Sequence, residues 1–135
     1  MVENIKKILL KLNDQQKPVW LLALLKMDEL VDRWSLIISA PWANEQNRDK
    51  EFGNILALLK ETLTNEESSS IARVNFMNKE DHLIEQLLKK NTGDVIKSET
   101  VNGNTVHEGY IIESNPSLVA SNDLFTTTPD PSAQL

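Results

Sequence analysis

The chain of 135 residues is 40% hydrophobic and 25% charged, which suits one globular domain with a core of its own. Its net charge of −6 and its isoelectric point of about 4.9 argue against nonspecific binding to nucleic acid or to an anionic membrane. The absence of cysteine excludes a thiol nucleophile, a disulfide framework and thiolate metal ligands.

A cytoplasmic location is the one that these features favour. A chain without cysteine fits a reducing compartment. Residues 1–16, MVENIKKILLKLNDQQ, separate their apolar residues with lysines and so differ from a secretory signal. No apolar run approaches the ~20 residues that a helix needs to cross a bilayer.

The first predicted elements are a helix and a strand. The helix covers residues 2–13, with one apolar face made by Val2, Ile5, Ile8, Leu9 and Leu12. Residues 18–27, PVWLLALLKM, are compatible with a helix, because leucine and alanine favour helices. We favour a strand, because the run is short, begins at a proline and is followed by the polar turn DELVD.

Residues 33–40, RWSLIISA, are predicted to form the second strand of a hairpin. One face would carry Trp34, Leu36, Ile38 and Ala40, and the other Ser35, Ile37 and Ser39. Both strands are apolar on nearly both faces, which is typical of strands inside a sheet that is covered on two sides. Pro41 has no N–H to donate, so the strand must end there.

A helix and a third strand follow. Residues 44–63 predict the clearest helix, capped at Asn44, Asn47 or Asp49. Its apolar stripe would be Phe52, Ile55, Leu56, Leu59 and Leu63. The pattern TNEE at 64–67 is a capping box that we expect to open one short turn. Residues 71–77 alternate as a half-buried strand, which the preceding helix would let run parallel to residues 33–40.

The last elements are a helix and a hairpin. Leu83, Ile84, Leu87 and Leu88 form a helical stripe between a cap in residues 78–81 and a stop at Gly93. Residues 95–112 predict a hairpin whose tight turn is Asn102-Gly103. Its register stays open, because a two-residue and a three-residue turn place different side chains inside.

Together these elements predict an α+β fold in the order α-β-β-α-β-α-β-β, with a mixed five-stranded sheet and three flanking helices. The domain would cover residues 1–113. Residues 114–135 contain three prolines, many Ser and Thr, two acids and no base. We expect these residues to form a flexible tail, because they cannot bury a core.

The segment SAPWAN at 39–44 is the candidate ligand site. It follows the end of a predicted strand and precedes a helix, where α/β sheets often bind ligands. Ser39, Trp42 and Asn44 would supply the contacts for a small ligand or for weak hydrolysis. The alternative is that Trp42 closes the core while an asparagine caps the helix.

Other chemistry finds little support in the sequence. The chain has two histidines, His82 and His107, and His82 with Glu85 alone does not make a metal site. No phosphate-binding loop, dinucleotide fingerprint or hydrolase nucleophile motif is present. We therefore expect no catalytic residues, no metal and no cofactor, which favours a protein that is not an enzyme.

In the tail, Leu124 and Phe125 form an apolar pair within an acidic segment. This pair resembles a short docking peptide, although a solubilising spacer has the same composition. The hairpin at 95–112 would be exposed at a sheet edge, where strand addition or dimerisation occurs. The function expected from these features is a non-catalytic protein-interaction or regulatory module. It would bind a protein partner or itself, and neither nucleic acid nor membrane.

Residues 34–42, Trp-x-Leu, two aliphatics and then Ser-Ala-Pro-Trp, are similar to a group of small uncharacterised bacterial proteins. The likeness extends to the strand before them and to LTNEE ahead of IARVNF, within residues 1–90. The resemblance implies an α+β domain and no particular activity.

Overall fold

The computed structural model describes residues 1–27 and 33–118, and these form the predicted α+β fold with its mixed five-stranded sheet. The elements in chain order are α1 (Val2–Asp14), β1 (Leu21–Met27), β2 (Trp34–Ser39), α2 (Arg48–Thr62), α3 (Asn65–Ser69), β3 (Ile71–Phe76), α4 (His82–Leu87), β4 (Val95–Val101) and β5 (Asn104–Ser114). The sheet order is β3-β2-β1-β5-β4, and β2 with β3 is the parallel pair.

β1 and β2 form a hairpin inside the sheet, as predicted, and β1 is the central strand. The two strands run antiparallel, with Leu21 opposite Ser39 and Leu25 opposite Ser35. Both strands are buried along nearly their whole length. Each face of this hairpin therefore needs its own cover.

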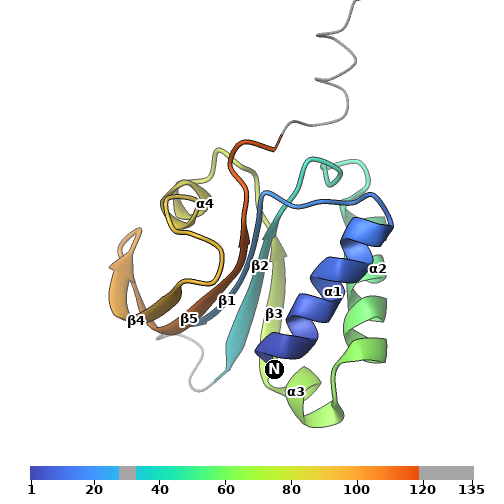
Figure 1. Cartoon of the computed structure of the whole chain (residues 1–135), viewed down its shortest axis with the longest axis horizontal. Helices are drawn as coiled ribbons and strands as arrows, with labels where there is room; N and C mark the ends of the chain where they lie inside the picture. Colours follow the sequence, from blue (N-terminus) through green and yellow to red (C-terminus); the bar gives the residue numbers. More distant parts are fainter. Residues whose placement is uncertain (28–32, 119–135) are drawn as a thin grey trace, which may run out of the picture.

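The two faces of the sheet carry different helices (Figure 1). Helices α1 and α2 lie side by side over one face and enclose the larger core with Leu22, Leu24, Leu36 and Ile38. The short helix α4 covers the other face, where it packs on Leu21, Ala23, Leu25 and Ile37. Within residues 1–27 and 33–118, no helix is long and apolar enough to cross a membrane.

Two expectations about the helices are wrong. The described residues contain four helices and not three, because the capping box of Thr64 and Glu67 opens a complete short helix, α3. The stripe expected on α2 is also displaced. The helix turns Ile55, Leu58, Leu59 and Leu63 toward the core. Phe52 and Leu56 remain 36% and 43% exposed. Helix α2 lies beside α1, so the face that it buries is the one turned toward α1 and the sheet.

The second hairpin turns at Asn102 and Gly103, whose φ angles of 50° and 79° match the tight turn predicted for this pair. The structure fixes the register with Val101 opposite Asn104. Of the two strands of this hairpin, β4 lies at a sheet edge, whereas β5 lies inside the sheet between β1 and β4. The prediction that the hairpin as a whole is exposed is therefore wrong for β5, which buries Val106, Ile111 and Ile112.

The beginning of α1 is held by the start of α3. The amino group of Met1 lies 2.7 Å from Oε2 of Glu67, and Nδ2 of Asn4 donates to Oε1 of Glu67 at 2.8 Å. The N–H of Thr64 also donates to Oε1, at 3.0 Å. The hydrogen bond from the amino group, with those from Thr64 and Asn4, lowers the pKa of Glu67 from an ordinary 4.5 to about 2.

This lowered pKa makes stability depend on pH. The unfolded chain binds the proton of Glu67 at a higher pH than the folded chain, so the contribution is complete above pH 4.5 and is lost between 4.5 and about 2. In Glu67→Gln the free energy of unfolding should fall less over this range than in the wild type. Urea unfolding at a series of pH values measures it. Glu3→Gln, at an exposed carboxylate, should keep the wild-type slope, and equal slopes in all three proteins would contradict the role given to Glu67.

Two glycines give a matched test of packing. A Cβ on Gly109 would lie 2.9 Å from Leu25 Cδ2 and 3.3 Å from both Ile96 Cβ and Val106 Cγ1. Gly109→Ala should therefore destabilise the fold by ~1–3 kcal/mol through overpacking. Gly53→Ala, where nothing lies within 4 Å, should stabilise α2 by ~0.5–1 kcal/mol. Urea unfolding measures both, and a destabilised Gly53→Ala with a neutral Gly109→Ala would contradict this packing.

Candidate functional site

The structure separates the three residues of the predicted ligand site. Ser39 is fully buried on the α4 face, opposite Leu21, and its Oγ has no hydrogen-bond partner among the described residues. Trp42 packs on the other face with the core beneath α1 and α2. Asn44 lies in the exposed loop before α2, where its Oδ1 accepts hydrogen bonds from the N–H groups of Gln46 and Asn47. Ser39 and Trp42 therefore do not share a rim.

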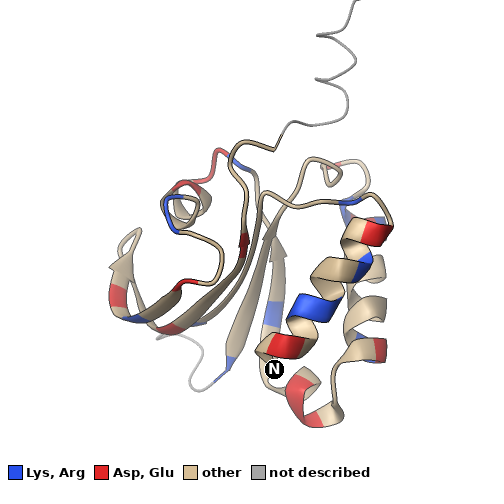
Figure 2. Ribbon diagram, viewed as in Figure 1, with Lys and Arg blue, Asp and Glu red and all other residues tan. Residues whose placement is uncertain are grey.

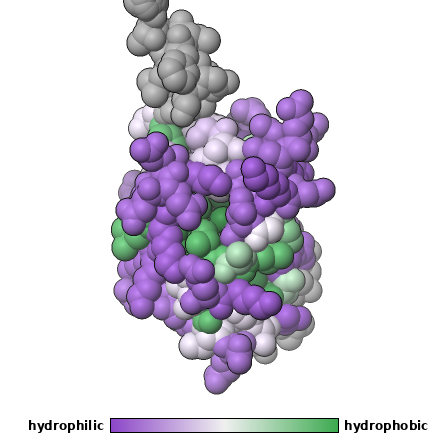
Figure 3. All heavy atoms as spheres, turned by 90° about the vertical axis from the view of Figure 1, so that its right-hand side faces the viewer, coloured by the Kyte–Doolittle hydropathy of each residue, from purple (hydrophilic) through white to green (hydrophobic). Residues whose placement is uncertain are grey.

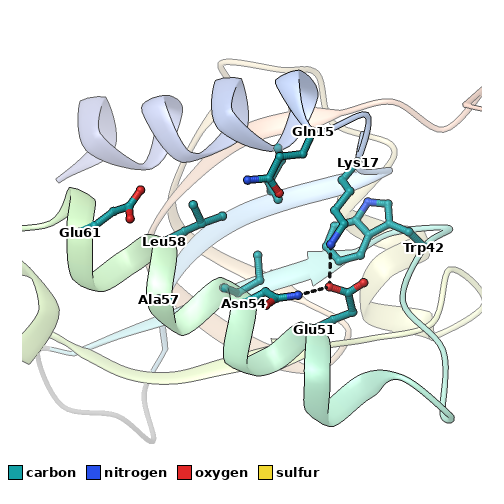
Figure 4. Close-up of a pocket in the computed structure, with 10 residues that line it drawn as sticks. Gln15, Lys17, Trp42, Glu51, Asn54, Ala57, Leu58 and Glu61 are labelled. Carbon is teal, nitrogen blue, oxygen red and sulfur yellow. Dashed lines mark hydrogen bonds and ion pairs between the residues drawn. The ribbon is translucent and has the colours of Figure 1, made fainter.

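Trp42 lines a cavity of about 290 Å³ between the end of α1 and the middle of α2 (Figure 4). The Nζ of Lys17 lies 5.3 Å from the centre of the Trp42 ring, in cation–π contact. The indole N–H of Trp42 donates to the carbonyl of Pro18 at 2.8 Å. Lysine therefore occupies a face of the ring, and the indole N–H is already bonded within the protein.

The charged groups of this cavity satisfy one another. Oε1 of the buried Glu51 accepts from Lys17 Nζ and from Asn54 Nδ2, each at 2.9 Å. Burial acts to raise the pKa of Glu51, but the hydrogen bonds from Lys17 and Asn54, with the charges of Lys17 and Lys50, outweigh it and lower that pKa. A carboxylate held ionised in this way has no proton to donate as a general acid. The arrangement closes the core between α1 and α2.

Metal-binding residues are not grouped in the described parts of the chain. No cluster of three or more His, Asp or Glu in residues 1–27 and 33–118 could hold a metal ion. His82 is 85% exposed and pairs with Glu85, with Nδ1 and Oε1 3.4 Å apart. Figure 2 shows acidic and basic residues interspersed on α1 and α2.

A second hollow, which the sequence did not predict, runs between α2 and β3. We call it the α2–β3 groove. One part, of about 410 Å³, is mainly apolar and includes Phe52, Leu56, Leu59, Leu63 and Val74. It shares Phe52 and Val74 with an adjoining hollow of about 320 Å³ that reaches Phe76. Figure 3, which faces the side bearing α1 and α2, shows hydrophobic residues gathered within a mostly hydrophilic surface.

One wall of the groove is the open edge of the sheet, because β3 is an outermost strand. Just after β3, the N–H of Met77 donates to the carbonyl of Ile38 in β2 at 2.9 Å. Consecutive residues of a strand point their backbone groups to opposite sides. Val74 and Phe76 therefore turn their N–H and C=O groups away from β2, toward the open edge.

The other edge of the sheet, β4, has a distorted residue in its middle. In β4, Ser98 has a left-handed φ of 47°, and the pairing with β5 skips from Lys97 to Glu99. The left-handed residue distorts β4 without shifting its register, and Lys97 and Glu99 place charges on this edge, which disfavours pairing with another strand. In β3 the irregularity lies at its start, and its pairing with β2 is regular from Arg73 to Phe76. The two edges of the sheet thus differ, and β3 is the edge with a regular stretch beside the groove.

Basic residues outnumber acidic residues in the lining of the groove. Arg48, Lys60 and Arg73 line the two adjoining hollows, together with Asp49. An incoming segment with acidic flanks would complement this surround. Leu124 and Phe125, the predicted docking pair, lie outside the described residues.

The signal for this groove was present in the sequence as the spacing of Phe52 and Leu56, one helical turn apart. Both residues belong to the apolar stripe predicted to face the core, and the structure exposes them instead. Comparisons with protein-family models, curated proteins and solved structures found no match to this chain. The resemblance to small bacterial proteins remains a prediction.

The Lys17–Glu51 pair should stabilise the fold more than an exposed pair does. Glu51→Gln leaves the half-buried Lys17 without its anion, and should cost ~1.5–3 kcal/mol. Glu61→Gln, which removes the partner of the exposed Lys11 at 3.0 Å, should cost ~0–1 kcal/mol. Urea unfolding compares the two, and equal costs would show that the first pair contributes no more than a surface contact.

Proposed function

We propose that the protein is a non-catalytic interaction module whose α2–β3 groove binds an extended segment of a protein partner. The segment would add to the sheet as a strand beside β3. One observation carries the proposal: Phe52 and Leu56 are exposed, one turn apart, beside the open edge of β3.

Strand addition uses two kinds of contact, and the groove offers both. The outward N–H and C=O groups of Val74 and Phe76 would supply the hydrogen bonds that give affinity. Alternate side chains of the added strand would point over α2, where Phe52 and Leu56 offer apolar surface. The segment is therefore expected to carry hydrophobic residues at every second position, with acidic residues on its flanks.

The alternative, a small-ligand site beside Trp42, has less support. A ligand there would have to displace Lys17 from the Trp42 ring and break its ion pair with Glu51. Either charge, left buried without its partner, would lower the stability of the protein.

The proposal is tested by selecting binders to the full chain from a random library of extended peptides. Enriched peptides should show alternating hydrophobic residues, and one of them, isotope-free, should shift amide resonances of α2 and β3 in the labelled protein. Leu56→Glu should weaken its binding at least ~10-fold, because a charge then faces the apolar floor.

Leu10→Glu is the matched control. Leu10 is also an exposed helical leucine, 62% exposed, but it lies on α1 outside the groove. This variant should bind the selected peptide as the wild type does. Equal loss in both variants, or resonance shifts centred on β4, would contradict the proposed site.

A further inference from the structure

We propose that residues 119–135 of the same chain bind in the α2–β3 groove through Leu124 and Phe125, antiparallel to β3. The inference rests on the proposed function, and it adds the regulation of that site. A partner segment would then have to displace the chain's own tail.

The described chain ends beside the segment that leaves β3. The carbonyl of Leu118 accepts from the indole N–H of Trp20 at 2.9 Å, and the N–H of Asn115 donates to the carbonyl of Trp20 at 2.7 Å. Lys79 Nζ, from the segment just after β3, donates to the carbonyl of Pro116 at 3.0 Å. Residues 115–118 are thus tied both to the start of β1 and to the segment that leaves β3.

This end of the sheet is also where β3 terminates. Leu21 pairs with Ser39, and Ile38 pairs with Phe76, so the start of β1 and the ends of β2 and β3 lie in one row. A tail that enters the groove from this end must run from Phe76 toward Ile71. That direction is antiparallel to β3.

The length of the tail fits this path. A strand added beside β3 would lie three inter-strand spacings from β1, about 15 Å. The six residues from Leu118 to Leu124 span up to ~20 Å when extended. Leu124 and Phe125 would therefore arrive beside Phe76 and Asn75, and the ten residues after Phe125 could continue along the groove.

The chemistry of the tail matches the groove. Consecutive residues of a strand face opposite sides, so one of Leu124 and Phe125 would meet Phe52 and Leu56. The tail also carries Asp123 and Asp130 and no base, whereas the groove lining has three basic residues, Arg48, Lys60 and Arg73, and one acidic residue, Asp49. Tethering raises the effective concentration of such a segment to the millimolar range, so modest contacts suffice.

Amide hydrogen exchange of the full chain tests the inference. The N–H groups of Val74 and Phe76 face the open edge and would be bonded by the tail. They should exchange at least ~10-fold more slowly in the wild type than in the double variant Leu124→Ser/Phe125→Ser. Leu135→Ser, a change at another apolar tail residue, should keep the slow exchange. The single variants Leu124→Ser and Phe125→Ser identify which side chain enters the groove.

The outcomes separate this inference from the proposed function. Fast exchange of both amides in the wild-type chain would overturn the tail inference and leave selected-peptide binding untouched. Tighter binding of a selected peptide to the double variant than to the wild type would support it, because a competitor has been removed. Slow exchange that is lost on dilution would overturn it in favour of a second copy at the same edge.

Discussion

Burial of β1 and β2 on both faces is the constraint from which the rest of the architecture follows. Two strands that are apolar along their length cannot stand at a surface, so each face requires a cover. Helices α1 and α2 cover one face and α4 the other. The crossover through α2 also places β3 parallel to β2 at the border of the sheet. At that border the cover is incomplete, and the α2–β3 groove results.

The elements that local chemistry decides were predictable from the sequence. Pro41 follows the end of β2, Thr64 with Glu67 caps α3, and Asn102-Gly103 makes the tight turn. The side of α2 that faces solvent was not predictable in the same way. Its apolar residues cover a wide arc of the helix, and Phe52 and Leu58 are distinguished only by the position of α1, which packs against α2. That position depends on contacts between residues far apart in the chain.

The site around Trp42 shows a similar limit. Sequence placed Ser39 and Trp42 three residues apart, but the strand alternation and the turn at Pro41 send them to opposite faces. Trp42 is in cation–π contact with Lys17, which lies in the segment between α1 and β1. The remaining tryptophans, Trp20 and Trp34, are likewise each in contact with a lysine. A binding edge leaves even less trace in a sequence, because backbone groups carry no side-chain signature.

The two edges of the sheet bear differently on strand addition. A sheet open on both sides can recruit molecules without end and grow into a fibre. Here the left-handed Ser98, between the charged Lys97 and Glu99, distorts the middle of β4 and disfavours growth from that side. A strand added at β3 would leave β4, with its charges and its left-handed residue, as the remaining edge.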